Sequence, residues 1–369
     1  MTIHIPKPLL IVVLALAAQH LCSVTMVLAQ PTIRYFVDLN YSFSPSSGAE
    51  QSLRRGSFEL GQFDMFTSYE ITDKIDVLAE LVFEAPPGTT ELVVDLERIE
   101  IGYAFGDYLS IRMGRFHSPL GYYANAFHHG RVLESAVRRP LFLEFEDEGG
   151  LLPAHAVGVW ARGQFITRPG IVQYHLGIVN GQKIDLDDRA LVINFNNDDN
   201  RNKPLLAALV FEPKAVKGLG MGASMYTGTI HGYTSAKADT PVVEVDQWIA
   251  GANVYYDELP LQLLAEYYVI NNTDMMVQPS RRFTTSAYFV QCAYEFRKRY
   301  RPYFRYEHIT PEAGDPYTGT LVGERTLSVL TAGFRYNVSL ESAIKIEGSS
   351  RRSGDETIMV LALQWALMF

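Results

Sequence analysis

Cysteine and long apolar runs are both scarce in this chain of 369 residues. After residue 29 no apolar run is longer than about residues 205–211. A membrane-spanning helix needs about 20 consecutive apolar residues, so the sequence predicts none. Enzyme motifs are missing as well: we find no nucleophile elbow, no His-Glu-x-x-His and no paired-cysteine zinc spacing. We therefore expect no enzymatic activity and no catalytic residues.

A basic stripe is also missing. The formal net charge is -9, whereas nucleic-acid binding requires clustered Lys and Arg, so we expect no nucleic-acid partner. What the chain has instead is apolar and aromatic: 47% of residues are hydrophobic, with 21 Tyr and 20 Phe. A chain this aromatic without a spanning helix fits a β-barrel whose lipid face is spread over many short strands.

Residues 1–29 are predicted to be a secretory signal peptide. Lys7 precedes an apolar run over residues 9–18, and Val27-Leu28-Ala29 suits a small-residue cleavage site. Cleavage would remove Cys22 and leave Cys292 alone, so no internal disulfide is expected. The mature chain, residues 30–369, would then be one outer-membrane domain.

The C-terminal stretch, residues 356–369, alternates large apolar residues with smaller or more polar ones. The large residues are Met359, Leu361, Leu363, Trp365, Leu367 and Phe369. Period-two alternation predicts a strand with one apolar face. Such an edge would aggregate unless another strand covered it, so we expect it to pair with the first strand and close a barrel. The stretch resembles the C-terminal strand of Gram-negative outer-membrane barrels. That resemblance implies that Trp365, Leu367 and Phe369 are an assembly signal read by the barrel-assembly machinery.

Strand-like segments recur along the whole mature chain. We predict 16 of them, at residues 33–41, 58–71, 75–85, 92–105, 109–118, 154–165, 171–179, 205–212, 219–230, 245–256, 261–271, 283–296, 302–310, 326–336, 340–349 and 356–369. Tight turns follow the even-numbered strands and longer connections follow the odd-numbered ones. This asymmetry predicts an all-β fold, a 16-stranded antiparallel transmembrane β-barrel with short periplasmic turns and long external loops.

Polar residues repeat on one face of several predicted strands. In residues 261–271, Gln262, Glu266 and Tyr268 share one face, while Leu263 and Tyr267 share the other. Unpaired charges are costly in a packed core, so the polar face is predicted to line a water-filled lumen. Aromatic residues beside the tight turns are predicted to form a girdle at the membrane interface: Phe105, Phe211, Tyr256, Phe296, Tyr336 and Phe369.

The longest irregular stretch is residues 119–152, after the fifth strand. In 16-strand porins a loop at this place folds into the barrel, and the resemblance implies a constriction loop; an external cap is the alternative. Its charged residues are Arg131, Arg138, Arg139, Glu144, Glu146, Asp147 and Glu148. Folded inward, its carboxylates would face Arg98 and Arg112 on the wall and sort solutes by charge. Ordinary loop and wall salt bridges are the simpler alternative.

Residues 111–121 resemble the strand of phosphate-selective porins that runs into a Phe-x-x-Pro-x-Gly pattern, here Phe116, Pro119 and Gly121. The likeness to that family is loose, because its selectivity depends on many lumen lysines and this mature chain has few. The lumen charges predicted here are Arg98, Arg112, Arg305, Arg335 and Lys345, opposed by Glu80, Glu100, Glu266, Glu295, Glu307, Glu341 and Glu347. We therefore do not predict a phosphate pore.

Metal sites have little support. His128 and His129 are adjacent, side chains of adjacent residues rarely converge, and no nearby residue completes a set. The loop with Asp185, Asp187, Asp188, Asp198 and Asp199 lacks the spacing of a calcium loop. We expect no metal and no cofactor.

The sequence as a whole predicts an outer-membrane porin, a passive channel for small hydrophilic or charged solutes with a slight preference for cations. Outer-membrane lipids would surround it, and the likeness to porins implies a homotrimer. Three alternatives remain open: a barrel acting as a sleeve or scaffold for a partner protein, an outer-membrane hydrolase, and a surface receptor or adhesin.

Overall fold

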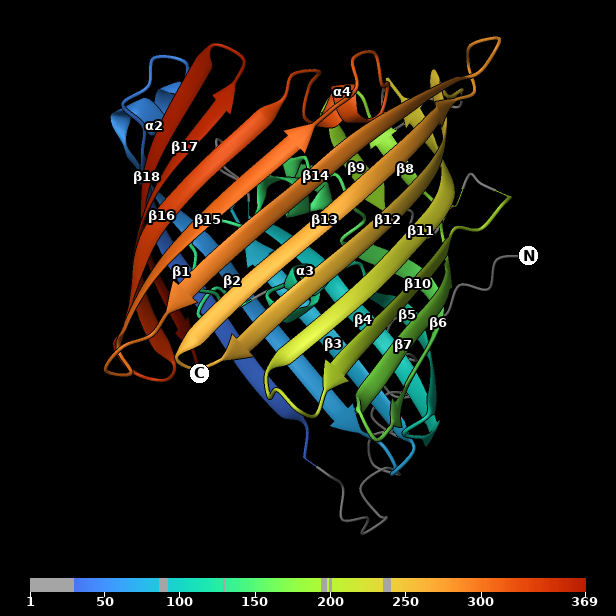
Figure 1. The fold of residues 1–369 in the computed structure, drawn as a ribbon, viewed down its shortest axis with the longest axis vertical. Helices are drawn as coiled ribbons and strands as arrows, with labels where there is room; N and C mark the ends of the chain where they lie inside the picture. Colours follow the sequence, from blue (N-terminus) through green and yellow to red (C-terminus); the bar gives the residue numbers. More distant parts are fainter. Residues whose placement is uncertain (1–29, 86–91, 129, 194–197, 199–200, 235–239) are drawn as a thin grey trace, which may run out of the picture.

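The computed structural model describes residues 30–85, 92–128, 130–193, 198, 201–234 and 240–369. The predicted signal peptide lies outside these residues. In the described part, 18 strands form a single sheet, and 16 of them close into an antiparallel barrel. Figure 1 shows tilted strands around an interior, with tight turns at one end and longer connections at the other.

The barrel strands follow one another in chain order. They are β1 (Thr32–Phe43), β2 (Ser57–Glu70), β3 (Ile75–Glu84), β4 (Val93–Gly106), β5 (Leu109–His117), β6 (His155–Ile166), β7 (Gly170–Val179), β10 (Leu205–Pro213), β11 (Leu219–Tyr233), β12 (Val243–Glu258), β13 (Leu261–Asp274), β14 (Arg281–Tyr294), β15 (Tyr300–Thr310), β16 (Leu327–Asn337), β17 (Ser342–Ser353) and β18 (Glu356–Met368). The 16 predicted strands are confirmed, with ends that differ by a few residues.

The last strand closes the ring against the first. β18 pairs antiparallel with β1, with Leu39 opposite Trp365. Beyond the end of β18, the backbone N–H of Phe369 donates to the carbonyl of Tyr35 at 3.0 Å, and the Tyr35 N–H donates back at 2.9 Å. The two rings also stack, with centroids 5.4 Å apart. The predicted closure is therefore confirmed, and neither terminal strand has a free edge.

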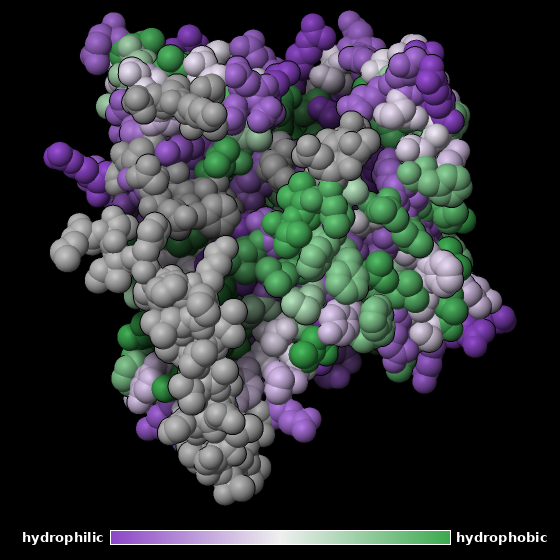
Figure 2. Space-filling view, turned by 180° about the vertical axis from the view of Figure 1, so that it is seen from behind, coloured by the Kyte–Doolittle hydropathy of each residue, from purple (hydrophilic) through white to green (hydrophobic). Residues whose placement is uncertain are grey.

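The outer surface of the barrel is apolar. On β18 the outward side chains of Met359, Leu361 and Trp365 are 52%, 53% and 48% exposed, while Ala362 and Gln364 between them are buried. Figure 2 shows apolar side chains gathered at mid-height between hydrophilic ends. No helix among the described residues is long and apolar enough to cross a bilayer. Closed strands with an apolar outer belt are the arrangement that satisfies both lipid and backbone.

One predicted long connection is wrong. β17 continues to Ser353, so the link to β18 is a tight turn at Gly354 and Asp355, where Gly354 has φ 59°. The positive φ explains why glycine stands there. The sequence reading ended this strand too early because Ser349 to Arg352 lack apolar alternation.

The structure also contains elements that the sequence analysis did not predict. β8 (Gln182–Asp185) and β9 (Ala190–Ile193) form a hairpin in the connection between β7 and β10, and β8 pairs parallel with the end of β11. The short helices are α2 (Gln51–Arg55), α3 (Tyr123–Ala126), η1 (Leu141–Leu143), η2 (Glu146–Glu148) and α4 (Thr318–Leu321). All of them lie in connections rather than in the barrel wall.

Candidate pore and inner loop

The connection between β5 and β6, residues 118–154, lies inside the barrel, where Figure 1 shows it behind β13 and β14. Its inward turn begins at the Phe-x-x-Pro-x-Gly segment. Phe116 is buried and stacks on Trp160, with centroids 4.8 Å apart. Gly121 has φ +83°, and a Cβ there would collide with the Tyr268 hydroxyl and the Glu266 carboxylate. Glycine therefore lets the loop turn directly against the wall.

A carboxylate of the barrel wall holds the first turn of the loop. Glu266 on β13 accepts hydrogen bonds from the backbone N–H groups of Tyr122 at 2.8 Å and Tyr123 at 2.6 Å. Its other oxygen accepts from the Tyr268 hydroxyl at 2.7 Å. Glu266 and Tyr123 are both buried. A buried carboxylate with three donors is satisfied, and a buried N–H group without an acceptor would be costly.

Other wall residues bind the loop backbone in the same manner. Glu347 accepts from the Val137 N–H at 2.9 Å, and Glu307 accepts from the Leu141 N–H at 2.6 Å. Wall cations donate to loop carbonyl oxygens: Arg305 to Arg139, Arg335 to Val132 and Glu134, and Lys345 to Arg131 and Ala136. The predicted lumen residues Arg305 and Arg335 therefore anchor the loop and are buried, at 1% and 7% exposed.

The loop also packs an apolar core against the wall. Phe142 and Leu151 are fully buried in a cluster with inward side chains of β11 to β16. The members of that cluster on β11 to β16 are Tyr226, Ile230, Ile249, Tyr255, Leu264, Tyr268, Ile270, Ala287, Phe289, Ile309 and Leu327. Burying a large apolar side chain contributes about 1.5–3 kcal/mol. The prediction that the inner face lines a water-filled lumen is therefore wrong for this part of the wall, because the loop covers it.

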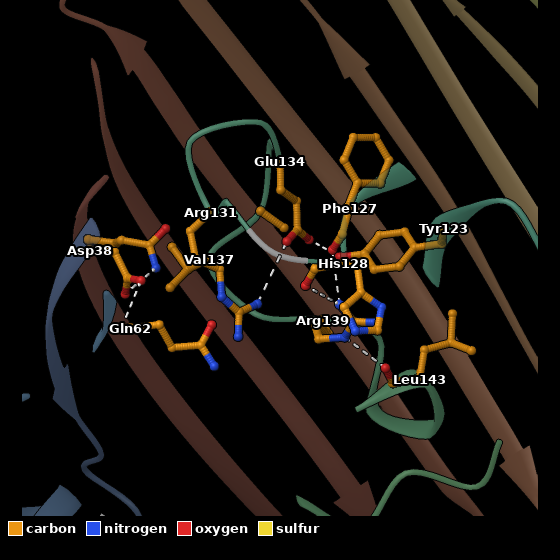
Figure 3. A network of polar contacts seen from close by, with 12 residues as sticks. Asp38, Gln62, Tyr123, Phe127, His128, Arg131, Glu134, Val137, Arg139 and Leu143 are labelled. Atoms are coloured by element: carbon orange, nitrogen blue, oxygen red, sulfur yellow. Dashed lines mark hydrogen bonds and ion pairs between the residues drawn. The ribbon is translucent and has the colours of Figure 1, made fainter. Parts of the chain in front are cut away.

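A buried charge cluster organises the middle of the loop (Figure 3). The carboxylate of Glu134 accepts a hydrogen bond from the Tyr123 hydroxyl. Its oxygens lie 3.8 Å from Arg131 and 3.9 Å from Arg305. Burial raises the pKa of Glu134 to about 7, although Lys345 and the neighbouring arginines act to lower it. The cluster links the loop to β15 and β17.

Arg139, a predicted constriction residue, supports the loop from within. Its guanidinium donates to the carbonyl oxygens of Leu143, Phe127 and His128 at 2.8, 2.9 and 3.0 Å; Figure 3 labels all four residues. It also lies over the ring of Phe145, 4.4 Å from its centroid. Burial lowers the pKa of Arg139. Its neighbour Arg138 is only partly buried.

The predicted wall cations Arg98 and Arg112 are paired within the wall. Arg98 binds Glu80 at 2.5 Å. Arg112 binds Glu100 at 2.8 Å and Asp76 at 2.6 Å. The expected field between these arginines and the loop carboxylates is therefore wrong for this pair, and the simpler alternative of wall salt bridges holds. Antiparallel neighbours supply their partners, which alternation alone does not reveal.

The loop carboxylates occupy different environments. Glu146 is buried and accepts from the backbone N–H of His155 at 2.7 Å. Glu148 is exposed and Glu144 is partly buried. Burial, and then the Glu148 carboxylate, raise the pKa of Glu144 well above its usual range. The side chain of Asp147 lies outside the described residues.

Two cavities lie on either side of the loop. The cavity toward the long connections has a volume of about 230 Å³ and is lined by Gln62, Glu84, Asp95, Glu97, Arg115, Phe145, Glu146, Glu148, His155, Leu191 and Val192. We call it the acidic vestibule. The cavity at the tight-turn end has a volume of about 800 Å³ and is lined by Leu259, Pro260, Glu295, Arg297, Lys298, Arg299, Arg301, Arg335, Asn337, Val338, Ser339 and Leu340. We call it the basic vestibule.

The sequence analysis missed a histidine cluster beside the acidic vestibule. His117 and His155 are direct cross-strand partners on β5 and β6, and His128 of the loop joins them. The set that the sequence left incomplete around His128 is thus completed by residues distant in the chain; His129 lies outside the described residues. A usable signal existed: strand ends that flank one loop must pair, so a histidine at each end should meet.

The closed ring, its apolar belt and the inward loop define a transmembrane barrel of the porin type. No protein-family model and no curated protein match the sequence, so the resemblance to the phosphate-selective porin family is not confirmed. Solved structures match in fold. An anion-selective porin from Comamonas acidovorans has a TM-score of 0.63 at 10% identity, over 92% of this chain and 99% of that one.

Two further structures have the same fold. The outer membrane channel DcaP of Acinetobacter baumannii gives a TM-score of 0.62 at 10% identity, over 92% of this chain and 97% of that one. OmpF of Salmonella typhi, in a complex with daunomycin, gives 0.59 at 12% identity, over 92% and 97%. At these identities the likeness establishes the fold alone.

Proposed function

We propose that this chain is an outer-membrane porin, a passive diffusion channel for small hydrophilic solutes without catalytic turnover. Residues 119–152 form its constriction, and residues 1–29 direct its export. The observation that carries the proposal is the placement of the loop between two polar vestibules, inside a barrel whose outer belt suits lipid.

The charge of the vestibules gives the channel its selectivity. Carboxylates dominate the acidic vestibule, and rings of like charge raise the local concentration of oppositely charged solutes. A slight preference for cations follows. The pairing of Arg98 and Arg112 with wall carboxylates supports this direction, because it neutralises cations that would otherwise attract anions.

The terminal strand carries the proposed assembly signal. Trp365 and Phe369 are 48% and 68% exposed on the outer face, where the barrel-assembly machinery would reach them before closure. A homotrimer is the proposed oligomer. Support comes from fold neighbours, among which the OmpT protein of Vibrio cholerae has a trimer form.

The test is single-channel conductance of the refolded protein in a planar bilayer with a salt gradient. Steady open steps are expected, with a reversal potential on the cation side. A reversal potential that shows anion preference would contradict the proposed cation selectivity but not the proposed channel function.

One observation favours a second candidate. The apolar packing of the loop against β11 to β16 is dense enough to suit a plugged barrel that acts as a sleeve or scaffold for a partner protein. The plugged barrel would be favoured over the porin if the folded protein gave no current in the bilayer and deletion of residues 119–152 produced one.

A further inference from the structure

Three buried histidines meet where the loop touches the wall. His117 ends β5, His155 begins β6, and His128 follows α3 in the loop. They are 8%, 3% and 4% exposed. One ring nitrogen from each lies within 4.8 Å of the other two. The rings of His117 and His128 are stacked, with centroids 3.3 Å apart.

The second nitrogens of two rings fix their tautomers. Nδ1 of His128 lies 3.0 Å from the carbonyl oxygen of Ala124, and Nδ1 of His155 lies 3.0 Å from the Glu146 carboxylate. A carbonyl or carboxylate oxygen accepts, so each Nδ1 carries the proton and donates it. Nε2 of His128 then presents a lone pair, whereas Nε2 of His155 faces the Glu97 carboxylate and donates a proton unless a metal ion replaces it. Metal-binding histidines are oriented in this way, by a carbonyl or carboxylate behind the ring.

Nε2 of His128 and Nε2 of His155 are 2.7 Å apart, and an oxygen of Glu97 lies 2.5 Å from Nε2 of His155. Lone pairs at this separation repel unless a positive species lies between them. A proton or a metal ion meets that need.

Carboxylates around the cluster favour a positive species between these nitrogens. Glu97 and Glu146 contact His155, and Glu80 lies 3.7 Å from His117. Arg115 lies 3.5 Å from Glu97, and Arg98 lies 2.5 Å from Glu80. Glu97, Glu146 and His155 also line the acidic vestibule, which gives an ion a negatively charged route to the cluster.

We propose that His117, His128 and His155, with Glu97, form a binding site for a zinc-class divalent transition-metal ion that ties the inner loop to the barrel wall. Three imidazoles and one carboxylate are a donor set that Zn²⁺ accepts in tetrahedral geometry. Bonds of about 2.0 Å place tetrahedral nitrogens about 3.3 Å apart, so the 2.7 Å gap opens modestly on binding. Because His128 belongs to the loop and the others to the wall, the ion cross-links the two.

Binding is tested on the full barrel refolded in detergent micelles, by calorimetric titration with Zn²⁺ and, in parallel, Mg²⁺. One Zn²⁺ per chain is expected, with no response to Mg²⁺. Co²⁺ is the spectroscopic probe, and a visible absorption band of four-coordinate Co²⁺ is expected in the wild type. That band separates a built site from adventitious surface binding.

The variants locate the site. His128→Ala and His155→Ala are expected to abolish both the stoichiometric heat and the Co²⁺ band. Glu146→Gln, which acts through His155, should weaken affinity about 10–100-fold. His308→Ala is the matched control, because His308 on β15 bonds Ser328 and lies outside the cluster. Heat-modifiable migration on gels checks folding, and Glu146→Gln carries the test if the histidine variants do not fold.

Absence of stoichiometric binding in the wild type would overturn the site and leave a shared proton between the rings. Binding unchanged in His128→Ala or His155→Ala would overturn it as well. Zn²⁺ on the loop side should also lower the single-channel conductance of the wild type and not of His128→Ala. The conductance measurement rests on the proposed channel function, whereas the Zn²⁺ titration does not. A barrel that gives no current but binds Zn²⁺ would therefore contradict the porin and support the metal site.

Discussion

The backbone N–H of Tyr123 and the carboxylate of Glu266 are joined by a 2.6 Å hydrogen bond between residues 143 positions apart in the chain. This bond connects the first turn of the inner loop to the inner face of β13. A carboxylate of the barrel wall thus accepts hydrogen bonds from the loop backbone rather than from lumen water.

Replacing this carboxylate should release the start of the loop. Glu266→Ala leaves the partly buried N–H group of Tyr122 and the buried N–H group of Tyr123 without their acceptor. Each costs about 1–3 kcal/mol, so the unfolding free energy should fall by about 2–6 kcal/mol and channel noise should rise. Urea unfolding and single-channel recordings check both. Glu341→Ala, at an exposed turn position, is the control, and equal effects in the two variants would contradict the role of Glu266.

Arg139 should be far more important than its neighbour. Arg139→Ala removes the donors for three loop carbonyl oxygens, so the loop should become open to protease while the barrel stays folded. Arg138→Ala, at a partly exposed position, should leave the cleavage rate close to wild type. Limited proteolysis followed by mass spectrometry of the fragments measures this. Equal protection in both variants would show that Arg139 does not hold the loop.

Opposite charge in the two vestibules should make the current depend on the sign of the voltage. Carboxylates line one end and Arg297, Lys298 and Arg299 line the other. At low salt the current–voltage curve should rectify, and at about 1 M salt, where the screening length is about 3 Å, it should straighten. Replacing the three basic residues by Gln should reduce the asymmetry, whereas Arg54→Gln on α2 should not. Rectification that persists at high salt would rule out this cause.

Cation preference should respond to pH through Glu144. Its pKa stands well above the usual range because of burial and the Glu148 carboxylate. An acid with a raised pKa takes up its proton first as pH falls. Cation preference should therefore begin to decline at a higher pH than ordinary carboxylates allow, as measured by the reversal potential. In Glu144→Gln that early step should be missing, and a profile identical to wild type would exclude Glu144.

The terminal aromatic residue should matter for barrel closure. Phe369→Ala removes the ring that stacks on Tyr35, an aromatic pairing of about 0.5–1.5 kcal/mol, and removes part of the proposed assembly signal. The heat-modifiable folded fraction in outer membranes should drop. Phe105→Ala, another exposed aromatic beside a tight turn, is the control. If Phe369→Ala lowers in vitro stability but not the folded fraction in cells, the residue is structural rather than a signal.

The barrel was predictable because every second residue of a strand faces lipid, and lipid requires that residue to be apolar. β18 shows this, with Met359, Leu361 and Trp365 outward. The contents of the lumen were not predictable in the same way. Leu264 and Glu266 lie on the same inner face, yet one packs in the apolar core and the other binds loop backbone. Which inner-face residue meets which part of the loop depends on the irregular fold of the loop, and no sequence periodicity predicts that fold.

Ion pairs escaped prediction for a related reason. Alternation places Arg98 and Arg112 on the inner face, but which carboxylate each meets depends on the register between strands. The structure places Glu80 directly opposite Arg98. The same register places His117 opposite His155, and only the fold adds His128.

The apolar core beneath the loop has a thermodynamic consequence. The outer belt of a membrane barrel exchanges no water when it meets lipid, so it contributes little to the heat capacity of unfolding. The cluster around Phe142 and Phe289 is different, because an undocked loop would expose it to the aqueous lumen. Undocking of residues 118–154 should therefore increase heat capacity as the unfolding of a soluble domain does, and the docked loop should lose stability on cooling below its temperature of maximum stability.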